Sequence, residues 1–258
     1  MYRDRAEAGL LLGEKVRDVL GQGSARDSER SHGIAIPAQA PAPGSGSEQA
    51  RAPANVRVFA IPRGGVAIGT GVARCLNAPL DVIVTRKIGH PEAPELGLGA
   101  VAEGGDPVFD DDLLTQVGLT REDLGGVVAR ERAELERRMA VYHAAVPDAG
   151  RAPPCEVAVV VDDGLATGVT ARAALRAVRA RGVSRIILAV PVAAQQAVGA
   201  IAEELGNAET GEVVTLVTSR RFRSVGEWYA DFGQLSDADV LTLLSSGGTT
   251  PRTPRMSH

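Results

Sequence analysis

The chain has 258 residues, of which 44% are hydrophobic and 23% are charged, and its mean hydropathy is zero. This composition can bury a large core, which excludes wholesale disorder. The net charge of −4 excludes a chain-wide excess of Lys and Arg for binding nucleic acid. The charged start is unlike a signal peptide, and no apolar run approaches the roughly 20 residues of a membrane-spanning helix. We therefore expect a soluble, cytoplasmic protein with no nucleic-acid or membrane partner.

The cysteines and histidines follow no metal-binding or disulfide pattern. Cys75 and Cys155 lie far apart without a CxxC spacing, and the four histidines are scattered. This usage fits a reducing compartment and argues against a disulfide framework or a zinc cluster.

Composition divides the chain into four parts. Residues 1–20 carry apolar residues at helical spacing and predict an N-terminal helix. Residues 21–55 are rich in Gly, Ser, Ala and Pro, so we expect a disordered insertion or linker there. Residues 56–244 are predicted to form the folded domain, and residues 245–258 a flexible tail.

Within 56–244, apolar β-branched runs alternate with helical patterns. The spacing predicts strands over 56–61, 80–85, 157–161, 186–190 and 213–217, and helices over 65–76, 120–143, 169–181 and 194–205. A hairpin is expected to join residues 98–101 to 107–109 through turn residues. Alternation of this kind predicts an α/β fold with a mainly parallel twisted sheet and helices on both faces.

The most informative stretch is 158–170, AVVVDDGLATGVT. Its apolar strand ends in Asp162 and Asp163, at the sheet edge where ligands bind in open α/β folds. A turn of small residues follows and leads into a helix, so free amides and threonine hydroxyls can hold a phosphate. An ordinary buried strand with a capped helix would not explain the paired Asp, and no Walker A loop occurs.

This stretch resembles the PRPP-binding motif of type I phosphoribosyltransferases. The resemblance implies that Asp162 and Asp163 act catalytically by holding the ribose hydroxyls, directly or through Mg²⁺. It implies a 5′-phosphate loop made of Gly164, Leu165, Ala166, Thr167, Gly168 and Thr170.

Two earlier segments match other parts of this family. Arg63-Gly64-Gly65 follows the first strand of the domain and looks like the turn that binds pyrophosphate. Arg86 and Lys87 end the second apolar run, where the family places catalytic basic residues against pyrophosphate. The stretch 88–97 is punctuated by Gly and Pro and fits a lid that excludes water.

The C-terminal stretch 222–232 contains half of the chain's eight aromatic residues. Aromatic clusters often belong to the core. The stretch also resembles the small hood that holds the acceptor base in related transferases. The resemblance to the hood implies that Phe222 and Trp228 contact the acceptor base. It also implies that Asp231 joins Asp162 and Asp163 at the metal.

The resemblance over 56–235 extends to a group of uncharacterised bacterial phosphoribosyltransferases. It implies Mg²⁺-dependent transfer of the phosphoribosyl group of PRPP to a nitrogenous base, with release of pyrophosphate, and we expect a homodimer. Ala166 stands where 6-oxopurine enzymes carry an Asp that handles the base proton, so the acceptor stays open. A regulator that binds PRPP or a nucleotide without turnover is a second hypothesis. A hydrolase with Asp162 or Asp163 as nucleophile is a third, although no partner base is evident.

Overall fold

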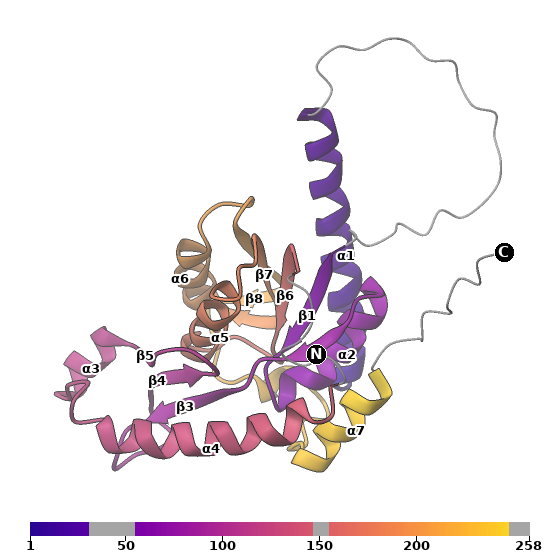
Figure 1. Ribbon diagram of the computed structural model, residues 1–258. Helices are drawn as coiled ribbons and strands as arrows, with labels where there is room; N and C mark the ends of the chain where they lie inside the picture. Colours follow the sequence, from indigo (N-terminus) through magenta and orange to yellow (C-terminus); the bar gives the residue numbers. More distant parts are fainter. Residues whose placement is uncertain (31–54, 147–154, 248–258) are drawn as a thin grey trace, which may run out of the picture.

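The computed structural model describes residues 1–30, 55–146 and 155–247, built around a five-stranded sheet (Figure 1). The strand order is β2-β1-β6-β7-β8, and every neighbouring pair is parallel. The strands are β1 (Val56–Ala60), β2 (Leu80–Val82), β6 (Val157–Val161), β7 (Arg185–Ala194) and β8 (Gly211–Ser219). The predicted parallel sheet is confirmed.

Helices cover both faces of this sheet (Figure 1). Along β6, Val157, Val159 and Val161 pack with one helical layer, whereas Ala158 and Val160 pack with the other. The first layer holds α1 (Arg5–Arg30), α2 (Gly64–Leu76) and α7 (Asp237–Gly247), and the second holds α5 (Val169–Arg179) and α6 (Gln195–Leu205). Successive side chains of a strand point to opposite faces, so burial on both faces explains the continuous apolar run of β6.

A second, antiparallel sheet stands beside the first, with α4 packed along it (Figure 1). It contains β3 (Thr85–Gly89), β4 (Gly97–Ala102) and β5 (Val108–Phe109), followed by α3 (Asp111–Val117) and α4 (Gly125–His143). The hairpin predicted between 98–101 and 107–109 is confirmed as β4 and β5. The lid predicted over 88–97 corresponds to the end of β3, the turn that follows it and the start of β4.

The apolar run predicted as one strand over 80–85 divides between the two sheets. Ile83 still donates its amide to Ala60 of the parallel sheet, at 3.0 Å. The carbonyl of Val84, the next residue, accepts from the Glu103 amide beside β4, also at 3.0 Å. The run is mostly apolar because its residues are buried in both places, the polar Asp81 and Thr85 included. Hydropathy alone therefore could not locate the break.

The predicted boundaries of the folded part are too narrow at both ends. The N-terminal helix continues past Gly21 to Arg30, because helix propagation is easy once the first turns are packed. Those turns bury Ala8, Leu12 and Val16 completely. At the other end α7 runs to Gly247, past the expected start of the tail. The rest of the predicted linker, 31–54, and of the predicted tail, 248–258, lies outside the described residues.

A short 3₁₀ helix, η1 (Gly226–Trp228), interrupts the otherwise irregular segment between β8 and α7. Within the described ranges, no helix combines the length and apolar character needed to cross a bilayer.

Candidate phosphoribosyl-binding site

Asp162 and Asp163 follow β6 at the sheet edge where the parallel strands end, and both side chains are partly buried. The Asp163 amide donates to Asp162 Oδ1 at 2.8 Å, which fixes the turn between them. Burial, together with the charge of Asp163, raises the pKa of Asp162 well above its usual range. Burial also raises the pKa of Asp163, and the Arg5 guanidinium opposes that shift. Adjacent, poorly hydrated carboxyl groups favour a ligand that brings hydrogen-bond donors or a cation.

The loop after the acidic pair is anchored at Leu165. Its amide donates to the Val192 carbonyl at 2.9 Å, and its own carbonyl accepts from Ala194 at 2.8 Å. The buried Leu165 side chain brings the backbone alongside β7, so its amide has a partner in this structure. That Leu165 belongs to a phosphate loop stays a prediction.

The remaining loop amides lead directly into α5. Gly168 adopts φ +83° immediately before the helix. Within the described residues, the amides of 166–170 donate to no acceptor. The hydroxyls of Thr167 and Thr170 likewise have no hydrogen-bond partner there. A row of free donors at a helix N-terminus is an arrangement that binds anions. That these donors hold a 5′-phosphate stays a prediction.

The turn 63–65 packs tightly against the acidic pair. A Cβ on Gly64 would lie 1.9 Å from Asp163 Oδ2, and a Cβ on Gly65 would lie 2.6 Å from the Val161 carbonyl oxygen. Neither position has room for a side chain. The two glycines therefore let the backbone of this turn meet the end of β6. That the turn also approaches an anionic ligand stays a prediction.

The cationic side chains predicted to contact pyrophosphate have partners away from the acidic pair. The Arg63 guanidinium lies 4.0 Å from Asp237 on α7. Arg86 on β3 donates twice to Glu131 on α4, at 2.8 and 3.0 Å. Lys87 donates from Nζ to a backbone carbonyl in the turn between β3 and β4. Their role toward pyrophosphate stays a prediction that requires these contacts to open.

The side chains of Arg5 and Tyr229, which lie outside the predicted set, contact Asp163. Arg5 donates from Nε to Asp163 Oδ2 at 2.9 Å. Tyr229 donates its hydroxyl to the Asp163 carbonyl at 2.6 Å, and burial with the Asp163 charge raises the tyrosine pKa. Tyr229 lies in the aromatic stretch 222–232, so composition indicated its neighbourhood. Arg5 lies 158 residues from its partner, and no local pattern points to it.

The other residues of the predicted hood are spread along the C-terminal segment. The rings of Phe222 and Trp228 are stacked with centroids 6.4 Å apart. Asp231 is exposed, and its Oδ1 accepts from the Gly233 amide at 3.2 Å. The described contacts do not join Asp231 to Asp162 or Asp163, so its predicted role at a metal has no support in this structure.

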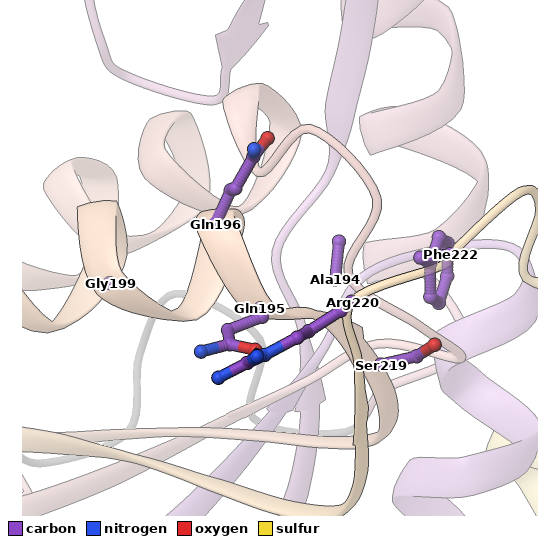
Figure 2. A pocket seen from close by; sticks show the side chains of 7 residues that line it. All are labelled: Ala194, Gln195, Gln196, Gly199, Ser219, Arg220 and Phe222. Atoms are coloured by element: carbon purple, nitrogen blue, oxygen red, sulfur yellow. The ribbon is translucent and has the colours of Figure 1, made fainter.

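A cavity of about 530 Å³ opens beside Phe222 at the carboxyl ends of β7 and β8 (Figure 2). Its lining residues are Ala194, Gln195, Gln196, Gly199, Ser219, Arg220 and Phe222. Figure 2 shows Arg220 alongside Gln195, to which its Nε donates at 2.9 Å. The backbone bridge between Leu165 and Ala193 places the predicted phosphate loop next to this cavity.

Comparisons with known proteins agree with this geometry. The model of the family "Phosphoribosyl transferase domain" matches residues 50–204. The Mycobacterium tuberculosis H37Rv protein named "Putative phosphoribosyl transferase Rv0571c" is 41% identical over 192 residues, which cover 73% of this chain and 41% of that protein. A protein of strain CDC 1551 matches to the same extent. The chain thus spans about two fifths of the length of the curated relatives it matches.

Among solved structures, TT1426 from Thermus thermophilus is similar with a TM-score of 0.66 and 34% identity, over 96% of this chain and 99% of that chain. The family match falls on a chain whose parallel sheet of five strands has a small antiparallel sheet beside it. The chain belongs to the phosphoribosyl transferase domain family.

Proposed function

We propose that this protein transfers the phosphoribosyl group of PRPP to a nitrogenous base and releases pyrophosphate. The observation that carries the proposal is the row of free amides over 166–170, placed directly after the carboxylates of Asp162 and Asp163. A sugar phosphate needs both groups, because its phosphate accepts hydrogen bonds while its ribose hydroxyls donate them. The amides would bind the 5′-phosphate, and the two carboxylates would hold the ribose.

In the proposed reaction, the bond between the anomeric carbon and the pyrophosphate oxygen breaks and a bond from that carbon to the base nitrogen forms. The developing positive charge on the ribose would be stabilised by positioned carboxylates rather than by a covalent intermediate. Gly64 would present its backbone to the leaving pyrophosphate, with Gly65 closing the turn through its amide, which donates to the Ile61 carbonyl at 3.0 Å. Ala166 offers no group for the base proton, so that proton would pass to solvent or to pyrophosphate.

The residues at this edge suit a magnesium ion that is shared with the ligand. Asp162 and Asp163 supply carboxylate oxygens, which Mg²⁺ prefers. The described residues hold no group of three or more His, Cys, Asp or Glu able to form a cage. Mg²⁺ commonly keeps several waters and substrate oxygens, so two carboxylates are sufficient. The ion would supply charge neutralisation for the pyrophosphate.

The acceptor would occupy the cavity beside Phe222. The proposal is supported by the backbone bridge between Leu165 and Ala193, because the next residue, Ala194, lines this cavity. The Phe222 ring offers a stacking surface, whereas Gln195 and Arg220 offer polar groups for the edge of a flat heterocycle. Trp228 would act on the acceptor only through its stack with Phe222.

A regulator that binds PRPP without turnover is the second candidate. The observation that favours it is that Arg86 is paired with Glu131 and Lys87 with its own turn, so neither basic side chain faces the acidic pair. The two candidates separate when the protein is incubated with PRPP, Mg²⁺ and a panel of purine and pyrimidine bases, and released pyrophosphate is measured. Base-dependent release supports the transferase. PRPP binding without release supports the regulator.

Light scattering on the same sample tests the expected homodimer.

A further inference from the structure

Arg5 places a cation at the edge of the candidate site, and three contacts fix it. Its Nε donates to Asp163 Oδ2 at 2.9 Å, and its Nη1 donates to the Gly233 carbonyl at 2.9 Å. Its guanidinium carbon lies 3.8 Å from the centre of the Phe232 ring. The side chain is only 11% exposed. A planar guanidinium held in this way has little freedom to turn away from the carboxylate.

The backbone that carries Arg5 is also held in place. Tyr2 donates its amide to the Trp228 carbonyl at 2.8 Å and accepts from the Ala230 amide at 2.7 Å. The first turn of α1 is capped reciprocally, because Asp4 accepts from the Glu7 amide while the Glu7 carboxylate accepts from the amide of residue 3. These hydrogen bonds join the N-terminal segment to η1 and to the residues that follow it. They therefore hold the backbone of Arg5 in a defined position relative to the candidate site.

We propose that Arg5 is a positioning residue of the phosphoribosyl site, holding the Asp163 carboxylate in the orientation that receives the ribose hydroxyls of the ligand. The inference rests on the proposed function and adds to the site a residue that lies 158 positions before Asp163 in the sequence. Asp163 Oδ2 is engaged by Arg5 and abuts Gly64, which leaves Oδ1 for the ligand. Without the guanidinium, this carboxylate would be free to rotate or to repel the phosphates of the ligand.

Calorimetric titration with PRPP and Mg²⁺ tests the proposal in four proteins: the parent, Arg5→Ala, Arg5→Lys and Arg3→Ala. Arg3 is the matched control, because its side chain is 74% exposed and pairs with its neighbour Asp4, away from Asp163. Arg5→Ala should weaken PRPP binding roughly tenfold or more, the scale of one charged hydrogen bond. Arg5→Lys should recover only part of this loss, since an ammonium cannot reproduce the guanidinium fork. Arg3→Ala should bind like the parent.

A second measurement separates positioning from support of the fold. Low millimolar guanidinium or methylguanidinium, added to folded Arg5→Ala, should restore part of the PRPP affinity by occupying the vacated place. Circular dichroism and the melting temperature report folding in each case. A weakened variant that guanidinium does not rescue would mean that Arg5 acts only through the fold.

Other outcomes overturn the proposal in distinguishable ways. Unchanged affinity in Arg5→Ala would show that Asp163 needs no such support. Tighter binding would show that Arg5 obstructs the site rather than preparing it. A parent protein that does not bind PRPP at all would reject the proposed function itself, whatever the variants do.

Discussion

Gly64 lies directly against the carboxylate of Asp163: a Cβ on Gly64 would stand 1.9 Å from Asp163 Oδ2 and 2.5 Å from its Cγ. The turn after β1 and the acidic pair after β6 therefore fit together only because residue 64 has no side chain. This contact joins two segments that the sequence separates by about a hundred residues, and it makes the position of the Asp163 carboxylate depend on the turn.

We expect Gly64→Ala to displace the Asp163 carboxylate and break its pair with Arg5. PRPP affinity should fall by roughly tenfold or more, because a charged hydrogen bond is lost. Gly126→Ala is the matched control, since a Cβ on Gly126 in α4 meets nothing within 4 Å. Calorimetry measures both variants. A folded Gly64→Ala protein with parental affinity would show that the turn does not set the carboxylate.

The proposed phosphate loop is tested by two glycines with nearly the same φ angle. Gly168 has φ +83° and Gly182 has φ +80°, and neither would meet a close clash on gaining a Cβ. Replacement by Ala should destabilise both proteins by about 1–2 kcal/mol, the cost of a left-handed conformation for a side chain. Only Gly168→Ala should also lose PRPP affinity, because Gly168 lies in the row of free amides. Urea unfolding and calorimetry measure the two effects, and equal PRPP affinity in the two variants would contradict the assignment.

A buried ionic cluster away from the site predicts a pH-dependent stability. His143 Nε2 lies 2.9 Å from the buried carboxylate of Glu103, which also pairs with Arg181. The hydrogen bond to Glu103 raises the pKa of His143, and the negative charge of Asp81 raises it further. Burial and the Arg181 charge lower this pKa, but the net shift is upward. Because the folded pKa lies above the unfolded value of 6.5, this stabilisation is fully present below pH 6.5 and is lost as the pH rises through the folded pKa.

His143→Gln removes that titration. The difference in free energy of unfolding between parent and variant should be larger at about pH 6 than at about pH 9. Urea unfolding at both values measures it. A difference that does not change with pH would mean that the His143 charge contributes nothing to stability.

Much of the architecture could be predicted, because it depends on local patterns. The run at 157–161 is apolar since β6 is covered on both faces, and the same strand is found at those residues. The helix expected from residue 169 begins there, because Gly168 permits the backbone turn that starts it. Residues in one strand or helix carry their own periodicity, so a single sequence is enough to place them.

The contacts that complete the site could not be predicted in this way. The pairing of Arg5 with Asp163 depends on how two distant segments meet, and neither segment alone shows it. The partner of Arg86 is equally non-local: Glu131 looks like one of several acids on a charged helix until α4 packs against β3. The sequence predicted these basic side chains near pyrophosphate. In this structure tertiary packing directs Arg86 to an acid on α4 and Arg63 to an acid on α7, and Lys87 donates to a backbone carbonyl of the turn after β3.

The most direct test of the central claim is a calorimetric titration of the protein with PRPP in the presence of Mg²⁺, carried out beside the Asp162→Asn/Asp163→Asn variant. We expect saturable binding by the parent and none by the folded double variant, because that variant keeps the amides of 166–170 but removes the charges proposed to hold the ribose and the metal. Equal binding by the two proteins, or no binding by the parent, would contradict the central claim.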